Sequence, residues 1–369
     1  MMKKVILLFI LISAISFGCQ KNQDVIRIGI AGPMTGDQAK MGMDFKNGAS
    51  LAVEEWNSRG GVLGKKIELM ISDDQHDPKQ AVSVANKMVN EGVVGVIGHF
   101  NSSCSIPASD VYNRAGIPMI TPGSTNPRLT EKGYRGVFRV CGRDDQQGKV
   151  GAEFVTNVLK LKTVAILHDK TTYGQGLADE FRNFLGDNVR VAYYGGIVQG
   201  DKDFKMVLTA IKSNTPDMIF FGGIYPEAGL LVKQAMELGL VTKFMSGDGT
   251  IDPKFIEIAG KAASEGTFLT FSPDPNHIPS AKGFIENYRA KYGDIGPYSI
   301  YAYDTANILL SAIKEANSAE GKAIIDKLHT MQFNVALGSI SFDEKGDVTT
   351  SPYVVWITRN GKFEEYWKP

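Results

Sequence analysis

The chain has 369 residues, of which 43% are hydrophobic, 22% charged and 9% aromatic. This composition excludes a disordered or collagen-like chain, and the length suits about two globular domains of roughly 150 residues each. Basic and acidic residues number 40 each. Because no net charge attracts phosphate backbones or anionic membranes, we expect no nucleic-acid partner and favour a small molecule of no net charge as the ligand.

The N-terminal residues 1–18 are predicted to be an export signal. Two lysines precede an apolar run over residues 5–17, which is too short to span a bilayer and has the length of a signal-peptide core. Ser16 and Gly18 supply small residues for cleavage, and Cys19 stands where a bacterial lipoprotein carries its lipid. We expect a periplasmic or extracytoplasmic protein held to the membrane only through a lipid on Cys19; the alternative is a secreted protein without one.

From residue 25 onward, short apolar strands alternate with helical stretches, which is typical of βαβ units and a parallel sheet. The first half is predicted to contain strands over 25–30, 67–72, 93–97 and 118–121, with helices over 44–58 and 78–91. The pattern then restarts with strands over 164–167, 189–194, 218–221, 243–246 and 267–271, and helices over 176–185, 204–212 and 227–238. Last come helices over 281–292 and 298–316 and strands over 339–342, 353–357 and 362–367. This order predicts two α/β lobes of similar size.

The sequence lacks the motifs of common catalytic sites. It contains no phosphate-binding G-x-x-x-x-G-K-[ST], no G-x-S-x-G nucleophile elbow and no H-E-x-x-H zinc motif, and its five histidines are scattered. Asp73, Asp74 and Asp77 are clustered after a predicted strand, which we interpret as a solvent-facing strand end rather than a calcium loop. We therefore expect no catalytic residue, no metal and no cofactor, and do not expect an enzyme.

Hydroxyl-rich segments follow two predicted strands of the first lobe, at the edge where open α/β sheets bind ligands. They contain Ser102 and Ser103 in one segment and Gly123, Ser124 and Thr125 in the other. Such residues either serve as helix N-caps or converge on a carboxylate through hydroxyls, backbone N–H groups and the helix N-terminal field. In the second lobe Asp248 follows a strand at the same edge. It is either a turn residue or the partner of an ammonium group.

Several stretches resemble the periplasmic leucine/isoleucine/valine-binding proteins, the solute receptors of branched-chain amino-acid ABC transporters. They lie at residues 73–82, 96–99, 107–110, 119–122, 168–174 and 343–347. The resemblance implies a type I periplasmic binding protein fold, with two Rossmann-like lobes built on parallel central sheets and joined by three crossover hinge strands. The lobes would comprise residues 24–142 plus 273–351, and residues 143–272 plus 352–369.

The resemblance also implies roles for the candidate residues. Ser102 and Thr125 would take the α-carboxylate of an amino acid. The Gly123 carbonyl, the Thr125 hydroxyl and Asp248 would take its α-ammonium group, and Tyr173 would close over the ligand. The complete expected ligand-binding set is Ser102, Ser103, Gly123, Ser124, Thr125, Tyr173, Ile224 and Asp248, with Met41, Phe100 and Tyr298 around the ligand's side chain.

Three of these positions depart from the family. Met41 replaces an aromatic residue, Ile224 replaces a tyrosine, and Asp248 is one methylene shorter than the usual glutamate. One methylene more or less in a hydrophobic pocket changes the binding free energy by about 1–3 kcal/mol. Such replacements can therefore change the order of affinities for leucine, isoleucine, valine and phenylalanine. The family's two disulfide cysteines are also absent, which leaves Cys104 and Cys141 as a pair or, as we favour, as separate buried thiols.

The function expected from the resemblance is that of a monomeric receptor. It would capture an aliphatic, branched-chain amino acid between the lobes and deliver it to the permease subunits of an ABC transporter. One alternative is a protein of the same fold for another solute, such as an aromatic amino acid, an amide or a small carboxylate. The other is a ligand sensor that signals to a chemoreceptor.

Overall fold

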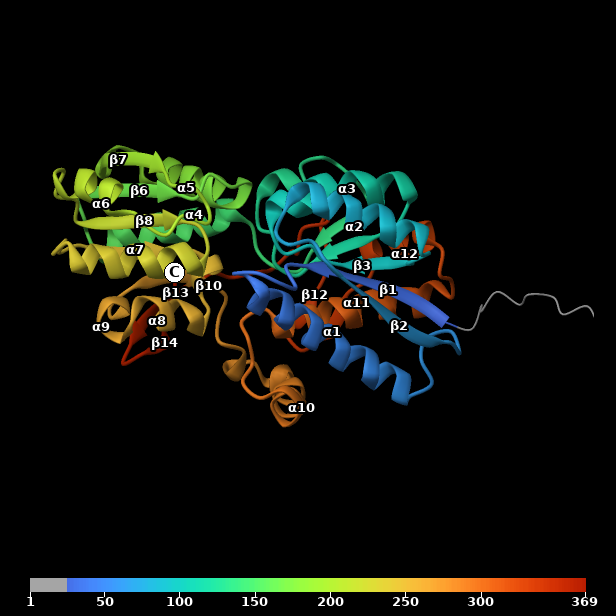
Figure 1. The fold of residues 1–369 in the computed structure, drawn as a ribbon. Coiled ribbons are helices and arrows are strands. Elements are labelled where there is room, and N and C mark those ends of the chain that lie inside the picture. The colour runs from blue at the N-terminus through green and yellow to red at the C-terminus, as the bar shows by residue number, and fades with distance from the viewer. Residues whose placement is uncertain (1–24) are drawn as a thin grey trace, which may run out of the picture.

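The computed structural model describes residues 25–369, so the predicted export signal and Cys19 lie outside the described residues. Two α/β lobes lie side by side, each built on its own sheet (Figure 1). Within residues 25–369, none of the helices combines the length and apolar character needed to span a bilayer.

The first lobe contains a five-stranded sheet in the order β2-β1-β3-β4-β5, in which all neighbours run parallel. Its strands are β1 (Val25–Gly32), β2 (Lys66–Asp73), β3 (Gly95–Ile97), β4 (Met119–Thr121) and β5 (Val137–Arg139). Its helices are α1 (Ala39–Ser58), α2 (Pro78–Asn90), α3 (Ser102–Ala115), α10 (Lys282–Tyr292), α11 (Ser299–Ala316) and α12 (Gly321–Thr330). A short hairpin, β11 (Phe333–Val335) and β12 (Gly338–Ile340), follows them.

The second lobe contains a seven-stranded sheet in the order β14-β13-β10-β9-β8-β6-β7. Its strands are β6 (Thr163–His168), β7 (Arg190–Gly196), β8 (Met218–Gly222), β9 (Lys243–Ser246), β10 (Phe268–Phe271), β13 (Val354–Arg359) and β14 (Lys362–Trp367). Its helices are α4 (Asp144–Glu153), α5 (Thr172–Leu185), α6 (Lys205–Lys212), α7 (Tyr225–Glu237), α8 (Pro253–Ala259) and α9 (Lys261–Ser264). Strands β6 to β10 run parallel, and β13 and β14 add an antiparallel edge.

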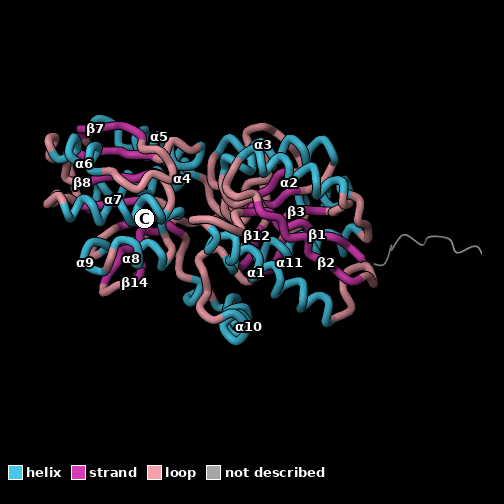
Figure 2. The backbone as a smooth tube through the Cα atoms, in the orientation of Figure 1, coloured by secondary structure: helices cyan, strands magenta, loops and turns pink. Residues whose placement is uncertain are grey.

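The chain passes between the two sheets three times: after β5, after β10 and before β13 (Figure 2). We propose lobe boundaries near residues 142, 272 and 351, as predicted from the sequence, and this strand order supports them. Three crossings allow the lobes to rotate about a shared hinge while each sheet stays intact.

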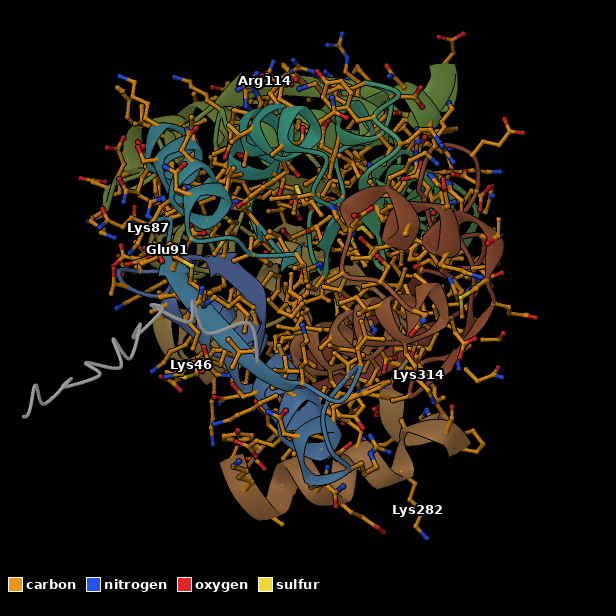
Figure 3. The ribbon with its side chains drawn as sticks, turned by 90° about the vertical axis from the view of Figure 1, so that its right-hand side faces the viewer. Lys46, Lys87, Glu91, Arg114, Lys282 and Lys314 are labelled. Carbon is orange, nitrogen blue, oxygen red and sulfur yellow. The ribbon has the colours of Figure 1, made fainter. Side chains whose placement is uncertain are left out.

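Central strands such as β8 form where the sequence is continuously apolar, because helices cover both faces of a parallel sheet. In β8 every residue is buried, and Phe220 stacks on Phe181 of α5 with 3.8 Å between ring centroids. Charged side chains lie at the periphery of the first lobe (Figure 3), among them Lys46, Lys87, Glu91, Arg114, Lys282 and Lys314.

The acidic cluster after β2 has a structural role. Asp73 accepts the backbone N–H of Met34 at 2.8 Å, and Asp77 caps α2 by accepting from Gln80 N at 2.7 Å. The expectation of a solvent-facing strand end is wrong for Asp74, which is fully buried with its Oδ2 2.7 Å from His99 Nδ1. A buried histidine accounts for this burial, since an unpaired carboxylate would be costly there.

The two cysteines of the described chain, Cys104 and Cys141, are separate buried thiols. Burial raises the pKa of both. They therefore act as small buried side chains rather than as reactive groups, Cys104 in the core of the first lobe and Cys141 at the first crossing between the lobes.

Candidate functional site

A narrow pocket, part of it open to solvent, lies between the lobes. It is lined by eight of the residues predicted from the sequence, namely Phe100, Ser102, Ser103, Gly123, Tyr173, Ile224, Asp248 and Tyr298. Asn101, Thr171 and Gly249 complete the lining. Residues from both lobes thus meet at the carboxyl ends of their strands, where α/β sheets bind ligands.

The start of α3 forms one end of the pocket. Its N-cap residue, Asn101, makes no side-chain capping bond, and its carbonyl accepts from Cys104 N and Ser105 N at 2.9 Å each. The N–H groups of Ser102 and Ser103 have no backbone partner within the described part of the chain. Free N–H groups and the helix dipole make this end suited to an anion.

The loop after β4 adds hydroxyl groups beside that helix start. Thr125 is fully buried, yet its Oγ1 has no hydrogen-bond partner among residues 25–369. Ser102 Oγ accepts the N–H of Asn126 at 3.3 Å, which leaves its own proton free to donate. Ser124 instead has a structural role, because its Oγ donates to the Phe100 carbonyl at 2.7 Å and ties the two loops together.

Asp248 forms the opposite end of the pocket and is almost fully buried. Its Oδ1 accepts the hydroxyl of Tyr173, and its Oδ2 accepts the hydroxyl of Tyr298, each at 2.8 Å. The Tyr173 oxygen in turn accepts Gly249 N at 3.0 Å. Burial raises the pKa of Asp248 above its usual value, and the two tyrosine hydroxyls oppose that rise. Such a desolvated carboxylate is suited to a cation.

Asp144 and Gln147, on the first turns of α4, lie beside Asp248 but outside the pocket lining, and both were missed from the sequence. The backbone N–H of Asp144 donates to the Thr125 carbonyl at 3.0 Å, so Asp144 also adjoins the loop after β4. Asp144 is fully buried, and neither of its carboxylate oxygens has a hydrogen-bond partner in the described structure. Burial raises its pKa well above the usual value, and the nearby charge of Asp248 raises it further. Gln147 donates to the Thr270 carbonyl at 3.1 Å, while its Oε1 is unpaired among these residues.

Aromatic rings form the apolar wall of the pocket. Phe100 and Tyr298 make an edge-to-face pair with ring centroids 5.0 Å apart. A side chain at Gly123 would place its Cβ 2.8 Å from the Phe100 ring, so any larger residue would displace that ring. Ile224 lines the second-lobe side, whereas Met41 lies in the hydrophobic core and is not part of the pocket lining.

Hydrogen bonds across the gap hold the two lobes together. Asn126 Nδ2 donates to the Thr172 carbonyl at 2.8 Å. Away from the pocket lining, the Asp37 carbonyl accepts the Tyr225 hydroxyl at 2.5 Å, and the Asp37 carboxylate pairs with Lys202 at 2.8 Å. These contacts define a closed arrangement in which the pocket is largely shielded from water.

A family model described as periplasmic binding protein matches residues 25–362. The chain belongs to the periplasmic binding protein family. The predicted family and the predicted type I fold are thereby confirmed. Members of the family are extracytoplasmic solute-binding proteins and not enzymes. No group of three or more metal-ligating side chains occurs in residues 25–369 of this periplasmic binding protein.

Individual relatives cover almost the whole chain. An amino acid binding protein of Pseudomonas aeruginosa is 44% identical over 338 residues, or 90% of each chain. The Leu/Ile/Val-binding protein homolog 2 of Brucella abortus is 42% identical over 343 residues, or 92% of each chain. Among solved structures, the branched-chain amino acid transporter protein LivJ of Streptococcus pneumoniae, in complex with isoleucine, superimposes with a TM-score of 0.86 at 30% identity, covering 94% of this chain and 100% of that one.

Proposed function

We propose that this periplasmic binding protein captures an aliphatic, branched-chain α-amino acid in the inter-lobe pocket and delivers it to the permease of an ABC transporter. The names of its relatives support the ligand class. The observation that carries the proposal is the division of the pocket into an anion-binding end, a cation-binding end and an aromatic wall between them. A zwitterion with an apolar side chain matches all three.

The α-carboxylate is assigned to the start of α3 and the loop after β4. The N–H groups of Ser102 and Ser103, the Ser102 hydroxyl and the Thr125 hydroxyl all have donor capacity to spare there. A buried polar group without a partner costs about 1–3 kcal/mol, so a carboxylate that satisfies several of them gains that energy on binding. Bonds to a charged acceptor are about twice as strong as neutral ones.

The α-ammonium group is assigned to Asp248, with Asp144 behind it. Both carboxylates are buried, and burial raises the pKa of each. An ammonium ion neutralises part of this charge and accounts for its placement. A solute without a positive group would leave the carboxylates buried and uncompensated, at several kcal/mol. Benzoates and other simple carboxylates are therefore disfavoured as ligands.

Calorimetric titration with each of the common amino acids tests the proposal. We expect leucine, isoleucine or valine to bind with a Kd of about 1 μM or tighter, equivalent to roughly −8 kcal/mol. Deamino and amide analogues of the best ligand should bind far more weakly, because each lacks one charged end. Failure of every aliphatic amino acid to bind would overturn the ligand class, although the fold would stand.

Export and anchoring complete the proposal. Cleavage before Cys19 and lipidation of its side chain would tether a monomeric receptor at the extracytoplasmic face, beside its permease. Mass spectrometry of the mature N-terminus tests this directly, since a diacylglycerol and a fatty acid on Cys19 add a known mass. An unmodified Cys19, or an uncleaved leader, would contradict it.

A further inference from the structure

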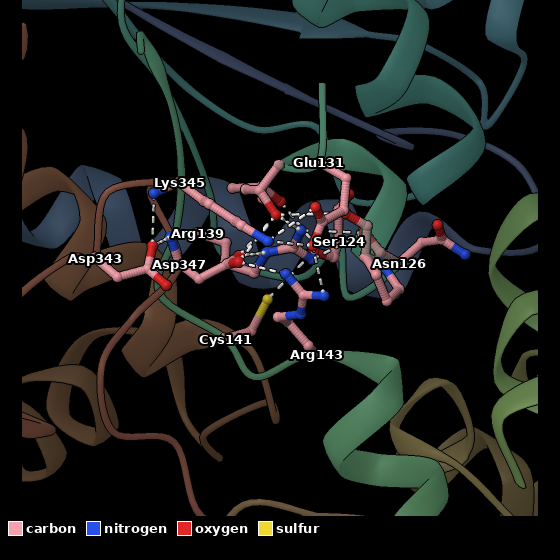
Figure 4. Close-up of polar contacts among 12 residues, drawn as sticks. Ser124, Asn126, Glu131, Arg139, Cys141, Arg143, Asp343, Lys345 and Asp347 are labelled. Atoms are coloured by element: carbon pink, nitrogen blue, oxygen red, sulfur yellow. Dashed lines mark hydrogen bonds and ion pairs between the residues drawn. The ribbon is translucent and has the colours of Figure 1, made fainter. Parts of the chain in front are cut away.

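A buried ion pair lies behind the carboxylate end of the pocket and takes no part in its lining. Arg139, the last residue of β5, and Asp347 are both buried, with Arg139 Nε 2.5 Å from Asp347 Oδ1 (Figure 4). The Thr130 hydroxyl donates to the same carboxylate at 3.0 Å. Arg143 donates to Asp347 Oδ2 at 2.6 Å. The carboxylate thus holds the Arg139 guanidinium in one fixed orientation.

The terminal nitrogens of Arg139 donate to the loop after β4, residues 122–126, which we call the ligand loop, and Nη2 also donates to the Thr130 hydroxyl oxygen at 2.8 Å. Nη1 donates to the Ser124 carbonyl at 2.8 Å, and both Nη1 and Nη2 donate to the Asn126 carbonyl at 3.1 Å. In a planar trans peptide the C=O and the following N–H point in opposite directions. Because the Ser124 carbonyl faces Arg139, the N–H of Thr125 faces away from it, and that N–H has no partner among the hydrogen bonds of the described residues.

The same pair also joins two of the three crossings between the lobes. Arg139 directly precedes the first crossing, and Asp347 lies just before the crossing that leads into β13. Their backbones are paired as well, with Arg139 N donating to the Gly346 carbonyl at 3.0 Å. The ligand loop is therefore fastened to the part of the fold about which the lobes turn.

We propose that Arg139 is a positioning residue for the ligand's carboxylate: held by Asp347, it fixes the peptide that presents the Thr125 N–H. The inference rests on the proposed function and deepens it. Arginine suits the task because its planar fork donates to several acceptors at set angles. Lysine carries the same charge, but its ammonium group is a compact point charge without the planar fork. Arg139→Lys can therefore keep the ion pair with Asp347 and lose the hydrogen bonds to the carbonyls of the ligand loop.

The test compares Arg139→Lys with wild-type protein, using leucine and leucinamide as the two probes. Leucinamide keeps the ammonium group and the side chain but lacks the carboxylate. The preference for leucine over leucinamide should fall by about tenfold or more in Arg139→Lys, since only the carboxylate end loses its presented donor. Arg143→Lys is the matched control, because Arg143 also donates to the Asp347 carboxylate but donates to no carbonyl of the ligand loop. Its preference should stay within about twofold of wild type.

An unchanged preference in folded Arg139→Lys would overturn the inference, as would equal losses in Arg139→Lys and Arg143→Lys. If Arg139→Lys does not fold, the same measurement on Asp347→Asn decides. We expect its preference to fall about threefold, since the guanidinium loses its anchor, and an unchanged preference would again overturn the inference. Wild-type protein that fails to bind leucine would instead overturn the proposed function, and the inference with it.

Discussion

At the scale of single residues, the pocket concentrates buried polar groups that the fold alone does not require. Thr125 and Asp144 are buried without side-chain partners in the described structure, and Asp248 has neutral hydroxyls as its partners rather than a cation. In native proteins each such exception calls for an explanation, and the charged groups of a ligand would supply one for these residues. Binding of the proposed zwitterion would convert each of these costs into a favourable interaction, so the closed arrangement favours such a ligand.

Asp248→Asn tests the charge at the cation end. The amide keeps the size of the side chain and can still accept from one tyrosine hydroxyl, but it cannot neutralise an ammonium group. We expect affinity for the best amino acid to fall by at least about 100-fold, roughly 3 kcal/mol, because a buried charged partner is removed. Titration calorimetry measures the loss, and thermal unfolding confirms that the variant is folded. Retained affinity would dismiss the role of Asp248 in holding the ammonium group.

Asp252→Asn should change stability in a pH-dependent way. Asp252 caps α8 by accepting Lys254 N at 2.8 Å, and it is fully buried. Burial raises its pKa from 3.8 to about 6, with the nearby charge of Asp44 adding to the rise and Lys40 opposing it. The folded state therefore favours the protonated form of Asp252. The contribution of this protonated side chain to folding stability is complete below about pH 4 and is lost as the pH rises through about 6.

Asparagine caps helices as well as aspartate does but carries no charge. The substitution should stabilise the fold at about pH 8 by on the order of 2 kcal/mol and leave stability almost unchanged at about pH 4. Urea unfolding at the two pH values measures the difference. An equal effect of Asp252→Asn at both pH values would show that the carboxyl group does not titrate between them.

At the scale of elements, the sequence predicted the strands well and α4 not at all. Continuous apolar runs identify buried strands such as β8 without ambiguity. In contrast, α4 has no apolar stripe: its buried residues are Asp144, Gln147, Gly148, Gly151 and Ala152. Helical periodicity depends on large apolar side chains, and here glycine replaces them so that two helices can approach closely. The polar residues missed at the site are carried by this helix, and they were missed for the same reason.

Short elements were missed for a different reason. Strand β5 has three residues, too few for any period to show, yet it ends at Arg139. Met41 was assigned to the pocket by resemblance, and its burial in the core is set by the packing of α1, which a sequence pattern cannot resolve. Except for Tyr298, the predicted residues that line the pocket follow strands closely in the chain, where chain position and spatial position coincide. Roles that depend on contacts between segments far apart in the chain, such as that of Arg139, could not be predicted from the sequence.

Gly148→Ala tests the close approach of α4 and α5. A Cβ at Gly148 would lie 2.7 Å from the backbone nitrogen of Phe181, a contact that requires one helix to move. Alanine normally favours a helix over glycine by about 1 kcal/mol, but overpacking costs about 1–3 kcal/mol, so we expect net destabilisation. Gly283→Ala in α10 is the control, because nothing lies within 4 Å of its added Cβ. It should be neutral or stabilising in the same denaturant titration, and equal effects at both sites would contradict the packing argument.

At the scale of the whole molecule, the two lobes depend on few direct contacts for closure. The ion pair between Lys202 and Asp37 is exposed on both sides, at 62% and 63%, so it contributes little. A ligand that touches both lobes adds interactions available only in the closed form, and it shifts the population by that difference in affinity. Affinity and closure are therefore linked, and weakening a contact between the lobes should weaken binding even where the contact is remote from the ligand.

Tyr225→Phe tests this linkage with a single atom. It removes the hydroxyl that donates to the Asp37 carbonyl across the gap and leaves the ring in place. A hydrogen bond of about 1 kcal/mol lost from the closed form alone should weaken ligand binding by roughly threefold to tenfold.

Tyr194→Phe is the matched control, because the Tyr194 hydroxyl donates to Asp179 at 2.5 Å within the second lobe. That bond is present in open and closed forms alike, so its loss should lower stability and leave the Kd for the ligand unchanged. Calorimetry on both variants separates the two effects, and an identical Kd for Tyr225→Phe and wild type would show that this contact does not contribute to closure.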